Sequence, residues 1–139
     1  MIAALAFDEI QVGSSASFEH SISDNDIVAF ASLSGDQSPL HTDIAYATQS
    51  GFSGAVVHGM YLGGLVSRLV GMHLPGSTAL LVKETLEFRS PAYSGDTVTV
   101  SGTVIKKTDS SQLIEVAVEI RTSQKRIASG SVIVLVRDE

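Results

Sequence analysis

The sequence of 139 residues contains no cysteine, only three prolines and no long uninterrupted apolar run. Without cysteine, the chain can form no disulfide, no thiolate nucleophile and no cysteine-ligated metal site. The longest apolar region, residues 55–74, is interrupted by two histidines, a serine, an arginine and four glycines. It falls short of the about 20 predominantly apolar residues that cross a membrane. We therefore expect no membrane association and a soluble, cytoplasmic protein.

Basic residues are absent from the first half of the chain. Residues 1–67 carry seven acidic side chains and no lysine or arginine, and the net charge of the whole sequence is −6. Nucleic acid and anionic membranes attract basic proteins, so we expect neither as the main partner. An anionic ligand must be met by cations after residue 80, and the candidates are Lys83, Arg89, Lys106, Lys107, Arg121, Lys125 and Arg126.

The motifs of several common enzyme classes are also missing. There is no glycine-rich phosphate loop and no Gly-x-Ser-x-Gly turn, which excludes the commonest nucleotide-binding and serine-hydrolase types. The four histidines show no ligand spacing such as His-x-x-x-His. We therefore expect no metal site and no cofactor.

Hydrophobic residues make up 44% of the chain, which is enough for a well-packed core in a single domain spanning residues 1–139. Period-two alternation predicts strands, and apolar residues three or four apart predict helices. The expected helices cover residues 24–34, 43–50 and 58–72, and the expected strands cover residues 15–22, 79–89, 97–107, 112–122 and 126–137.

The segment 58–72 is apolar on nearly all sides, which is typical of a buried central helix. Its interior contains Gly63 and Gly64, although glycine costs about 1 kcal/mol per position relative to alanine. We therefore expect another backbone or a ligand to approach closely there. A helix that is apolar all round needs wrapping, and a curved antiparallel sheet of about five strands can wrap it. The pattern predicts an α+β protein with the hot-dog fold.

One short loop brings two proton-handling groups together. Asp36 and His41 are five residues apart, and Pro39 between them prevents one regular helical turn from spanning the pair. An acid and an imidazole in a stiffened loop could act on one substrate atom. A bland interpretation fits as well, in which Asp36 caps the following segment and His41 lies on the surface.

Three residues of the central helix region are candidates for support rather than chemistry. His58 fits a packed, hydrogen-bonded residue at a helix start better than a catalyst. Ser67 lies on a stripe of small residues at helical spacing and could hydrogen-bond Asp36 or His41, or simply a backbone carbonyl. Arg68 is the one cation of this region and is expected to pair with a nearby acid.

The residues around the loop resemble the MaoC-like family of (R)-specific enoyl-CoA hydratases. Residues 34–41 match the family's Ser-Gly-Asp-x-Asn-Pro-aliphatic-His signature, and Ala47 follows at the expected distance. Residues 57–60 match a second block, Val-His-Gly-Met, which opens the central helix in the family. Residues 74–76 and 91–96 match further along, so the resemblance covers nearly the whole chain.

The resemblance implies reversible hydration of a trans-2-enoyl thioester to an (R)-3-hydroxyacyl thioester, carried by coenzyme A or acyl carrier protein. It implies that Asp36 and His41 are the catalytic pair, and we favour Asp36 for proton transfer at C2 and His41 for the water. Gly59 matches the family's oxyanion donor, and Ser67 matches a serine near the pair. Ser38 stands where the family has asparagine, so this position lacks the carbonyl and NH₂ of an amide.

Family members are at least dimers, so the resemblance further implies a C2 homodimer with joined sheets and each active site near the interface. Two alternatives remain open at this point, a thioesterase on the same fold and a non-catalytic acyl-thioester binding module. Thioester hydrolysis needs one carboxylate, whereas hydration of a double bond needs the acid and imidazole together.

Overall fold

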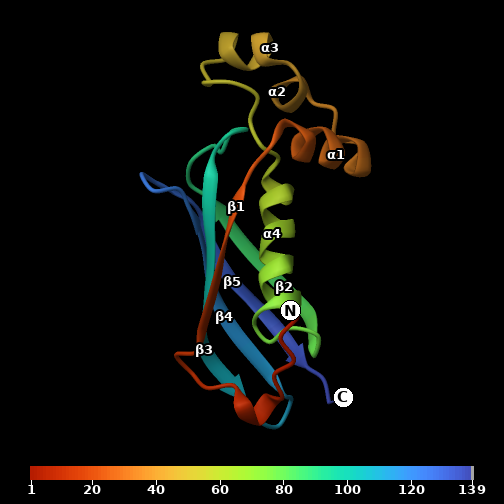
Figure 1. Cartoon of the computed structure of the whole chain (residues 1–139), viewed down its shortest axis with the longest axis vertical. Helices are drawn as coiled ribbons and strands as arrows, with labels where there is room; N and C mark the ends of the chain where they lie inside the picture. Colours follow the sequence, from red (N-terminus) through yellow and green to blue (C-terminus); the bar gives the residue numbers. More distant parts are fainter. Residues whose placement is uncertain (139) are drawn as a thin grey trace.

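A long curved sheet with one helix lying along it forms the body of the protein, as seen in the computed structural model, which describes residues 1–138 (Figure 1). The sheet has five antiparallel strands in the order β1-β3-β4-β5-β2. Their bounds are β1 (Ser15–Ser21), β2 (Ala79–Phe88), β3 (Thr97–Thr108), β4 (Leu113–Arg121) and β5 (Arg126–Val136). All five strands predicted from the sequence are present.

The helices precede most of the sheet along the chain. They are the short 3-10 helix η1 (Phe7–Glu9), α1 (Asp24–Ser34), α2 (Pro39–Thr42), α3 (Ile44–Gln49) and the main helix α4 (Gly59–Met72). The three expected helices are confirmed, and α2 was not expected. Its first residue is Pro39, a position where the missing N–H of proline has no helical partner to lose. The expected irregular loop is therefore confined to residues 35–38, which include Asp36, and His41 lies in a helical turn.

Alternating burial along β3, β4 and β5 turns one face of the sheet toward α4. Val98, Val100 and Val104 of β3 are buried, and the neighbouring residues between them are more exposed. At Gly102 on the same face, an added Cβ would lie 2.8 Å from a methyl group of Leu69 on α4. Glycine at this position lets the helix approach the sheet closely. A curved antiparallel sheet around one helix is the hot-dog arrangement predicted from the sequence.

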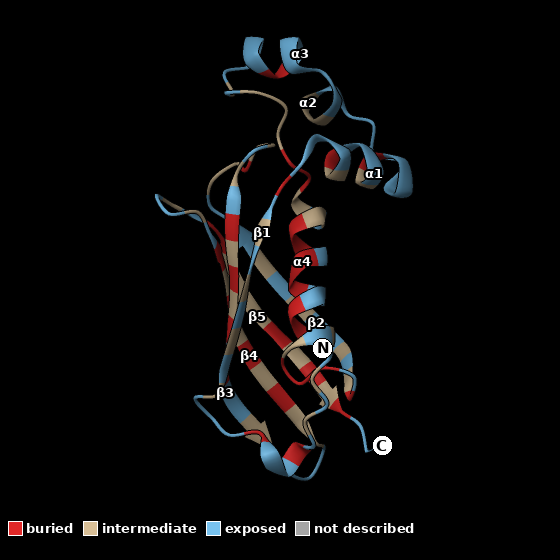
Figure 2. Ribbon diagram, in the orientation of Figure 1, coloured by how far each residue is buried: buried red, intermediate tan, exposed pale blue. Residues whose placement is uncertain are grey.

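Helix α4 is buried on one side only in the single chain. Leu62, Val66 and Leu69 face the sheet and are at most 3% exposed, whereas Met60 is 65% exposed on the other side. Figure 2 shows this division, with buried residues toward the strands and exposed residues on the opposite side of the helix. The expectation of a helix wrapped on all sides is therefore wrong for one chain, because five strands enclose only one face of α4.

Gly63, in the interior of α4, is closely approached, as expected, but by a side chain. A Cβ at Gly63 would lie 3.0 Å from Oε2 of Glu84 on β2, whereas nothing lies within 4 Å of a Cβ at Gly64. Oε1 of Glu84 is buried without a hydrogen-bond partner among the described residues. Burial raises the pKa of the Glu84 carboxyl, because a low-dielectric surrounding disfavours the charged form.

Helices α1, α2 and α3 gather at one end of the sheet, beside the N-terminal end of α4 (Figure 1). A capping box forms the start of α1. The hydroxyl of Ser23 accepts from the N–H of Asp26 at 3.1 Å, and the Asp26 carboxylate accepts from the N–H of Ser23 at 3.1 Å. These two bonds satisfy backbone donors that a helix start leaves free. None of the helices in the described part of the chain is long and apolar enough to cross a membrane.

Candidate active site

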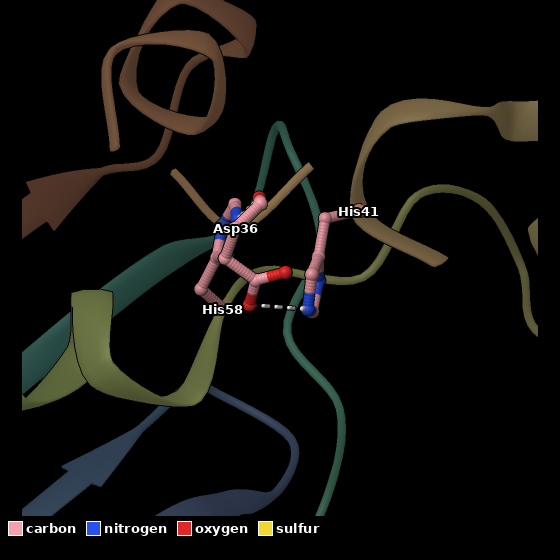
Figure 3. A group of neighbouring side chains, drawn as sticks. All are labelled: Asp36, His41 and His58. Carbon is pink, nitrogen blue, oxygen red and sulfur yellow. Dashed lines mark hydrogen bonds and ion pairs between the residues drawn. The ribbon is translucent and has the colours of Figure 1, made fainter. Parts of the chain in front are cut away.

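The acid and imidazole predicted from the sequence lie side by side at the N-terminal end of α4. Helix α1 ends at Gly35, whose φ of +78° is in the left-handed region that glycine adopts freely. This turn directs Asp36 back toward α4, and the helical turn α2 places His41 opposite it. The carboxylate Oδ2 of Asp36 lies 3.7 Å from Nε2 of His41 (Figure 3). The two groups therefore face the same small space.

Asp36 makes one local hydrogen bond and leaves its other oxygen free for a ligand. Its Oδ1 accepts from the backbone N–H of Ser38 at 3.2 Å, as the bland interpretation of a capping residue predicts. Its Oδ2 faces His41, and half of the Asp36 side chain is exposed. A separation of 3.7 Å is too long for a direct hydrogen bond, but both groups can reach one small molecule between or beside them.

The proton on the His41 ring is placed by the backbone. Nδ1 of His41 lies 2.6 Å from the carbonyl oxygen of Val56. A carbonyl only accepts, so Nδ1 carries the hydrogen and donates it. In the neutral ring Nε2 then has a free lone pair, which faces Asp36. The His41 side chain is only 15% exposed, so its orientation is fixed by its surroundings and it is not a surface histidine.

Gly59 begins α4 beside this pair. As the first residue of a helix, its backbone N–H has no intrahelical acceptor, and the helix dipole favours negative charge there. The ring of Phe88 covers Gly59 so closely that an added Cβ would lie 3.1 Å from the Phe88 Cζ atom. The absence of a side chain therefore keeps the N–H open to a ligand beneath Phe88.

Two cavities meet at His41. The first has a volume of about 380 Å³, is lined mainly by apolar side chains, and includes Gly59, Phe88 and Arg89. The second has a volume of about 360 Å³, and Ile27 of α1 and Ile44 of α3 are among the residues that line it. Cavities of this size fit small acyl ligands. His41 can thus act on a molecule that occupies the first cavity, which Gly59 also lines.

His58 lies directly behind the pair, as a packed residue at the helix start. It is 2% exposed, and its ring stacks on His41 with the centroids 3.9 Å apart and the planes 24° apart. Asp36, His41 and His58 are close enough to be considered as metal ligands. Ring nitrogens bind metals in the plane of the ring, however, and stacked rings direct their lone pairs in nearly parallel directions. This arrangement does not favour one ion between the two histidines.

Ser38 and Ser67, the two serines singled out from the sequence, place no side-chain group at the Asp36–His41 pair in the described structure. Ser38 donates its backbone N–H to Asp36 and accepts at its carbonyl from the N–H of His41 at 2.9 Å, but its side chain does not cap α2. Ser67 is exposed on the far side of α4. Among the described residues no hydrogen bond joins Ser67 to Asp36 or His41. Its position eight residues after Gly59 places it about 12 Å along the helix axis.

Among residues 1–138 Arg68 pairs with no acid, contrary to expectation. Its guanidinium lies 4.2 Å above the Phe18 ring, and its NH1 group is 3.5 Å from Nδ1 of His20. The His20 side chain is the centre of a polar cluster that the sequence did not indicate. Its Nε2 lies 3.0 Å from Asp26 and 2.9 Å from the hydroxyl of Tyr61.

This cluster links α1 to α4 and shifts two pKa values. Burial raises the pKa of the Asp26 carboxyl, but hydrogen bonds from the Ser23 backbone, His20 and Tyr61 outweigh it and hold that pKa below the usual 3.8. Burial and the hydrogen bond to Asp26 raise the pKa of the Tyr61 hydroxyl. The hydroxyl of Tyr61 donates to Asp26 at 3.0 Å, so the phenol stays protonated and bridges the two helices.

Several of the cations considered for an anionic ligand are engaged within the protein. Lys107 donates to the backbone carbonyls of Phe7 and Ile10, and Arg121 and Arg126 both pair with Glu119. These three are poor candidates for the ligand.

Arg89 and Lys125 lie closer to the pair. Arg89 lines the first cavity and pairs with Glu87 at 2.8 Å. Lys125 donates to the carbonyl of Pro91, which also lines that cavity, at 3.1 Å. Sequence reasoning had no basis for separating these two from the others, because the cavity is formed by segments far apart in the chain.

The chain is similar to known proteins in both sequence and structure. The family described as MaoC like domain matches residues 9–126. An (R)-specific enoyl-CoA hydratase of Rhodospirillum rubrum is 35% identical over 130 residues, which are 94% of this chain and 90% of that protein.

Two solved structures are also similar. An unliganded R-hydratase of Pseudomonas aeruginosa superimposes with a TM-score of 0.93 at 29% identity, covering 99% of this chain and 89% of the other. An (R)-hydratase of A. caviae superimposes with a TM-score of 0.86 at 32% identity, covering 90% of this chain and 96% of the other.

Proposed function

Because the chain belongs to the MaoC-like domain family, we propose that it is an (R)-specific enoyl-CoA hydratase. The reaction is the reversible addition of water to a trans-2-enoyl thioester, which gives an (R)-3-hydroxyacyl thioester. The observation that carries the proposal is the pairing of Asp36 Oδ2 with the unprotonated Nε2 of His41, 3.7 Å apart, beside the first cavity and the free N–H of Gly59.

The pair supplies what the addition of water requires. A water held between the carboxylate and Nε2 of His41 gives one proton to Nε2 while its oxygen forms a bond to C3 of the substrate. The π electrons of the C2=C3 bond move toward the thioester carbonyl. The proton taken by His41 passes to the Asp36 carboxylate, which delivers it to C2, so both groups return to their starting forms. The water is consumed, and no other reactant is needed.

Gly59 stabilises the charge that forms during this step. When C3 accepts the water oxygen, negative charge develops on the thioester oxygen. The backbone N–H of Gly59 at the start of α4 is aimed at that oxygen, and the helix dipole adds to the stabilisation. Removing one such donor typically costs on the order of 100- to 1000-fold in rate.

The first cavity takes the acyl thioester, and Arg89 is the cation best placed for the phosphates of its carrier. The cavity contains both a reactive end, at His41 and Gly59, and a cationic end, at Arg89. The Arg89 side chain is 47% exposed, so it can exchange its pairing with Glu87 for a ligand. Coenzyme A and the phosphopantetheine of acyl carrier protein both carry phosphate, and either fits this chemistry.

The acting form is a C2 homodimer joined through one face of the chain. Edge strand β2 and helix α4 together expose Met60, Val82 and Phe88, each at least 51% exposed; we call this the β2–α4 face. The other edge strand, β1, exposes serines and a glutamate instead. An open apolar edge favours pairing with a second copy. Phe88 also lines the first cavity, so this dimer places the site beside the interface.

An assay with crotonyl-CoA tests the proposed activity. Loss of the enoyl thioester absorbance without release of free thiol, and formation of the (R)-3-hydroxybutyryl product, are expected. Release of free thiol would instead indicate a thioesterase. Binding of crotonyl-CoA with neither reaction would indicate a non-catalytic acyl-thioester module.

A further inference from the structure

His58 contacts both members of the pair although it faces neither of the two cavities. Its ring stacks on His41 at 3.9 Å between centroids, and its Nε2 lies 3.0 Å from the backbone carbonyl oxygen of Asp36. Figure 3 shows the three side chains grouped at the start of α4. One ring thus contacts the residue that holds the carboxylate and also the imidazole that the carboxylate faces.

The state of the His58 ring follows from its partners. The carbonyl of Asp36 only accepts, so Nε2 of His58 carries the hydrogen and donates it. Nδ1 of His58 is buried and has no hydrogen-bond partner among the residues described. The ring therefore has no free donor and presents only its π face to His41. It has no route to a substrate atom, which excludes direct proton transfer by His58.

The opposite side of His58 is supported by α1. The Phe30 ring lies 4.9 Å from His58 between centroids and 6.1 Å from Tyr61. His58 is thus held between Phe30 and His41, and at 2% exposure it has no space to rotate. Helix α1, the start of α4 and the turn α2 meet at this one ring.

We infer that His58 is a positioning residue that sets the spacing of Asp36 and His41. Its N–H fixes the backbone at Asp36, and its π face fixes the plane of the His41 ring. The inference rests on the proposed hydration activity, because the spacing of Asp36 and His41 affects the rate only if both groups act in that reaction. A displacement of about 1 Å between reacting groups can cost on the order of 100-fold in rate.

Two variants separate the two contacts. His58→Phe keeps the stacked ring and removes the N–H to Asp36, whereas His58→Gln keeps an N–H donor and removes the ring. We expect each to lower kcat for crotonyl-CoA hydration by about 10- to 100-fold, with KM within about twofold, because neither change touches the cavity.

A matched control uses another stacked histidine. His73 stacks on Phe18 with the centroids 5.4 Å apart, at the opposite end of α4, and His73→Gln should leave kcat unchanged. The ring nitrogens of His41 provide a readout that does not depend on activity. In ¹⁵N spectra the wild type and His58→Phe should show the Nδ1–H form. His58→Gln should show a mixture of both forms, because the His41 ring is then no longer held in line with the Val56 carbonyl.

The possible failures can be told apart. Folded His58 variants with wild-type kcat would overturn the inference and leave the proposed function intact. An inactive wild type would contradict the proposed function, and the ¹⁵N spectra would still decide the role of His58, since an unchanged His41 form in His58→Gln overturns it. If neither His58 variant folds, Phe30→Leu removes the supporting ring, and an unchanged kcat in that variant overturns the inference.

Discussion

Asp36 and His41 differ in how firmly the protein holds them. His41 is anchored by its donation to the Val56 carbonyl and is 15% exposed, whereas the Asp36 carboxylate, among residues 1–138, accepts a hydrogen bond only from the Ser38 N–H and is 50% exposed. The imidazole is therefore preorganised in one orientation, and the carboxylate can adjust when a ligand enters. This agrees with a role for His41 toward the water and for Asp36 toward the carbon.

Removal of either member of the pair should abolish most activity without unfolding the protein. Asp36→Asn keeps the size of the side chain and removes the base, and His41→Ala removes its partner. Acid–base groups contribute on the order of 100- to 10,000-fold, and because the two act as a unit, the double variant should lose about as much kcat as either single variant. Steady-state hydration of crotonyl-CoA measures this. Near-normal activity of one single variant would mean that the pair is assigned wrongly.

Arg89 should affect substrate binding and not the chemical step. Arg89→Gln removes a cation at the cavity but leaves the pair untouched, so KM for crotonyl-CoA should rise about 3- to 20-fold with kcat nearly constant, given that exposed charge contacts are weak. The KM of the wild type should rise with salt because such contacts are screened. Lys106→Gln is the control, since Lys106 lies at the far end of β3, outside the cavity. A flat KM in Arg89→Gln would place the phosphates elsewhere.

The sequence indicated Asp36 and His41 because the acid, the proline and the histidine lie within one short segment of the chain. His58 was recognised as a packed residue, but its contacts with the pair depend on two rings brought together from segments 17 residues apart, at His41 and His58. Arg68 was expected to pair with an acid, and it lies over Phe18 instead. Stacking partners leave no periodic pattern, so only the folded chain reveals them.

At the scale of elements, local chemistry decided the ends of helices and strands. Apolar residues three or four apart located α1, which a Ser23–Asp26 capping box begins and Gly35 ends, and period-two alternation located all five strands. The strand order β1-β3-β4-β5-β2 was not predicted, since alternation tells which face is buried and not which strands are neighbours. The one-sided burial of α4 was missed because the segment is apolar on nearly all sides, so its sequence does not mark the side that stays exposed.

The link between α1 and α4 should depend on pH through Asp26. The pKa of Asp26 is lower in the folded chain than its usual 3.8, so the ionised carboxylate stabilises the fold above that value, and this contribution is lost as the pH falls through the folded pKa. Asp26→Asn should therefore lower the free energy of unfolding at pH 7 by about 1–3 kcal/mol, the range for hydrogen bonds to a charged group.

Thermal or urea unfolding at two pH values measures this effect. As the pH falls through the lowered pKa of Asp26, the wild-type carboxyl becomes protonated and the difference between the two proteins should shrink. Asp24→Asn is the control, because Asp24 lies in the same first turn of α1 but is exposed, and its loss should cost only a few tenths of a kcal/mol. Equal destabilisation by Asp26→Asn at both pH values would exclude the carboxylate charge as the cause.

At the scale of the whole molecule, one side of the single chain leaves apolar side chains exposed. The β2–α4 face combines an edge strand with the exposed side of the main helix, and Glu84 lies within it with a raised pKa and an unsatisfied oxygen. A second copy covering this face would bury the apolar side chains and enclose the cavity beside Phe88. The exposed residues of α4, which are unusual for a central helix, are then explained by the partner's contact.

A single charge in the β2–α4 face should separate the proposed dimer into monomers. Val82, on edge strand β2, is 57% exposed in the single chain, and Val82→Glu would bury an unpaired carboxylate in each half of the interface, which costs several kcal/mol. Ile105→Glu makes the same change at a side chain that is 50% exposed on β3, outside this face. Light scattering at micromolar concentration should give a dimer for the wild type and for Ile105→Glu, and a monomer for Val82→Glu. The monomer should also lose hydration activity, because the cavity lies beside the interface. A monomeric wild type, or a Val82→Glu variant that stays dimeric, would show that the two copies do not meet through this face.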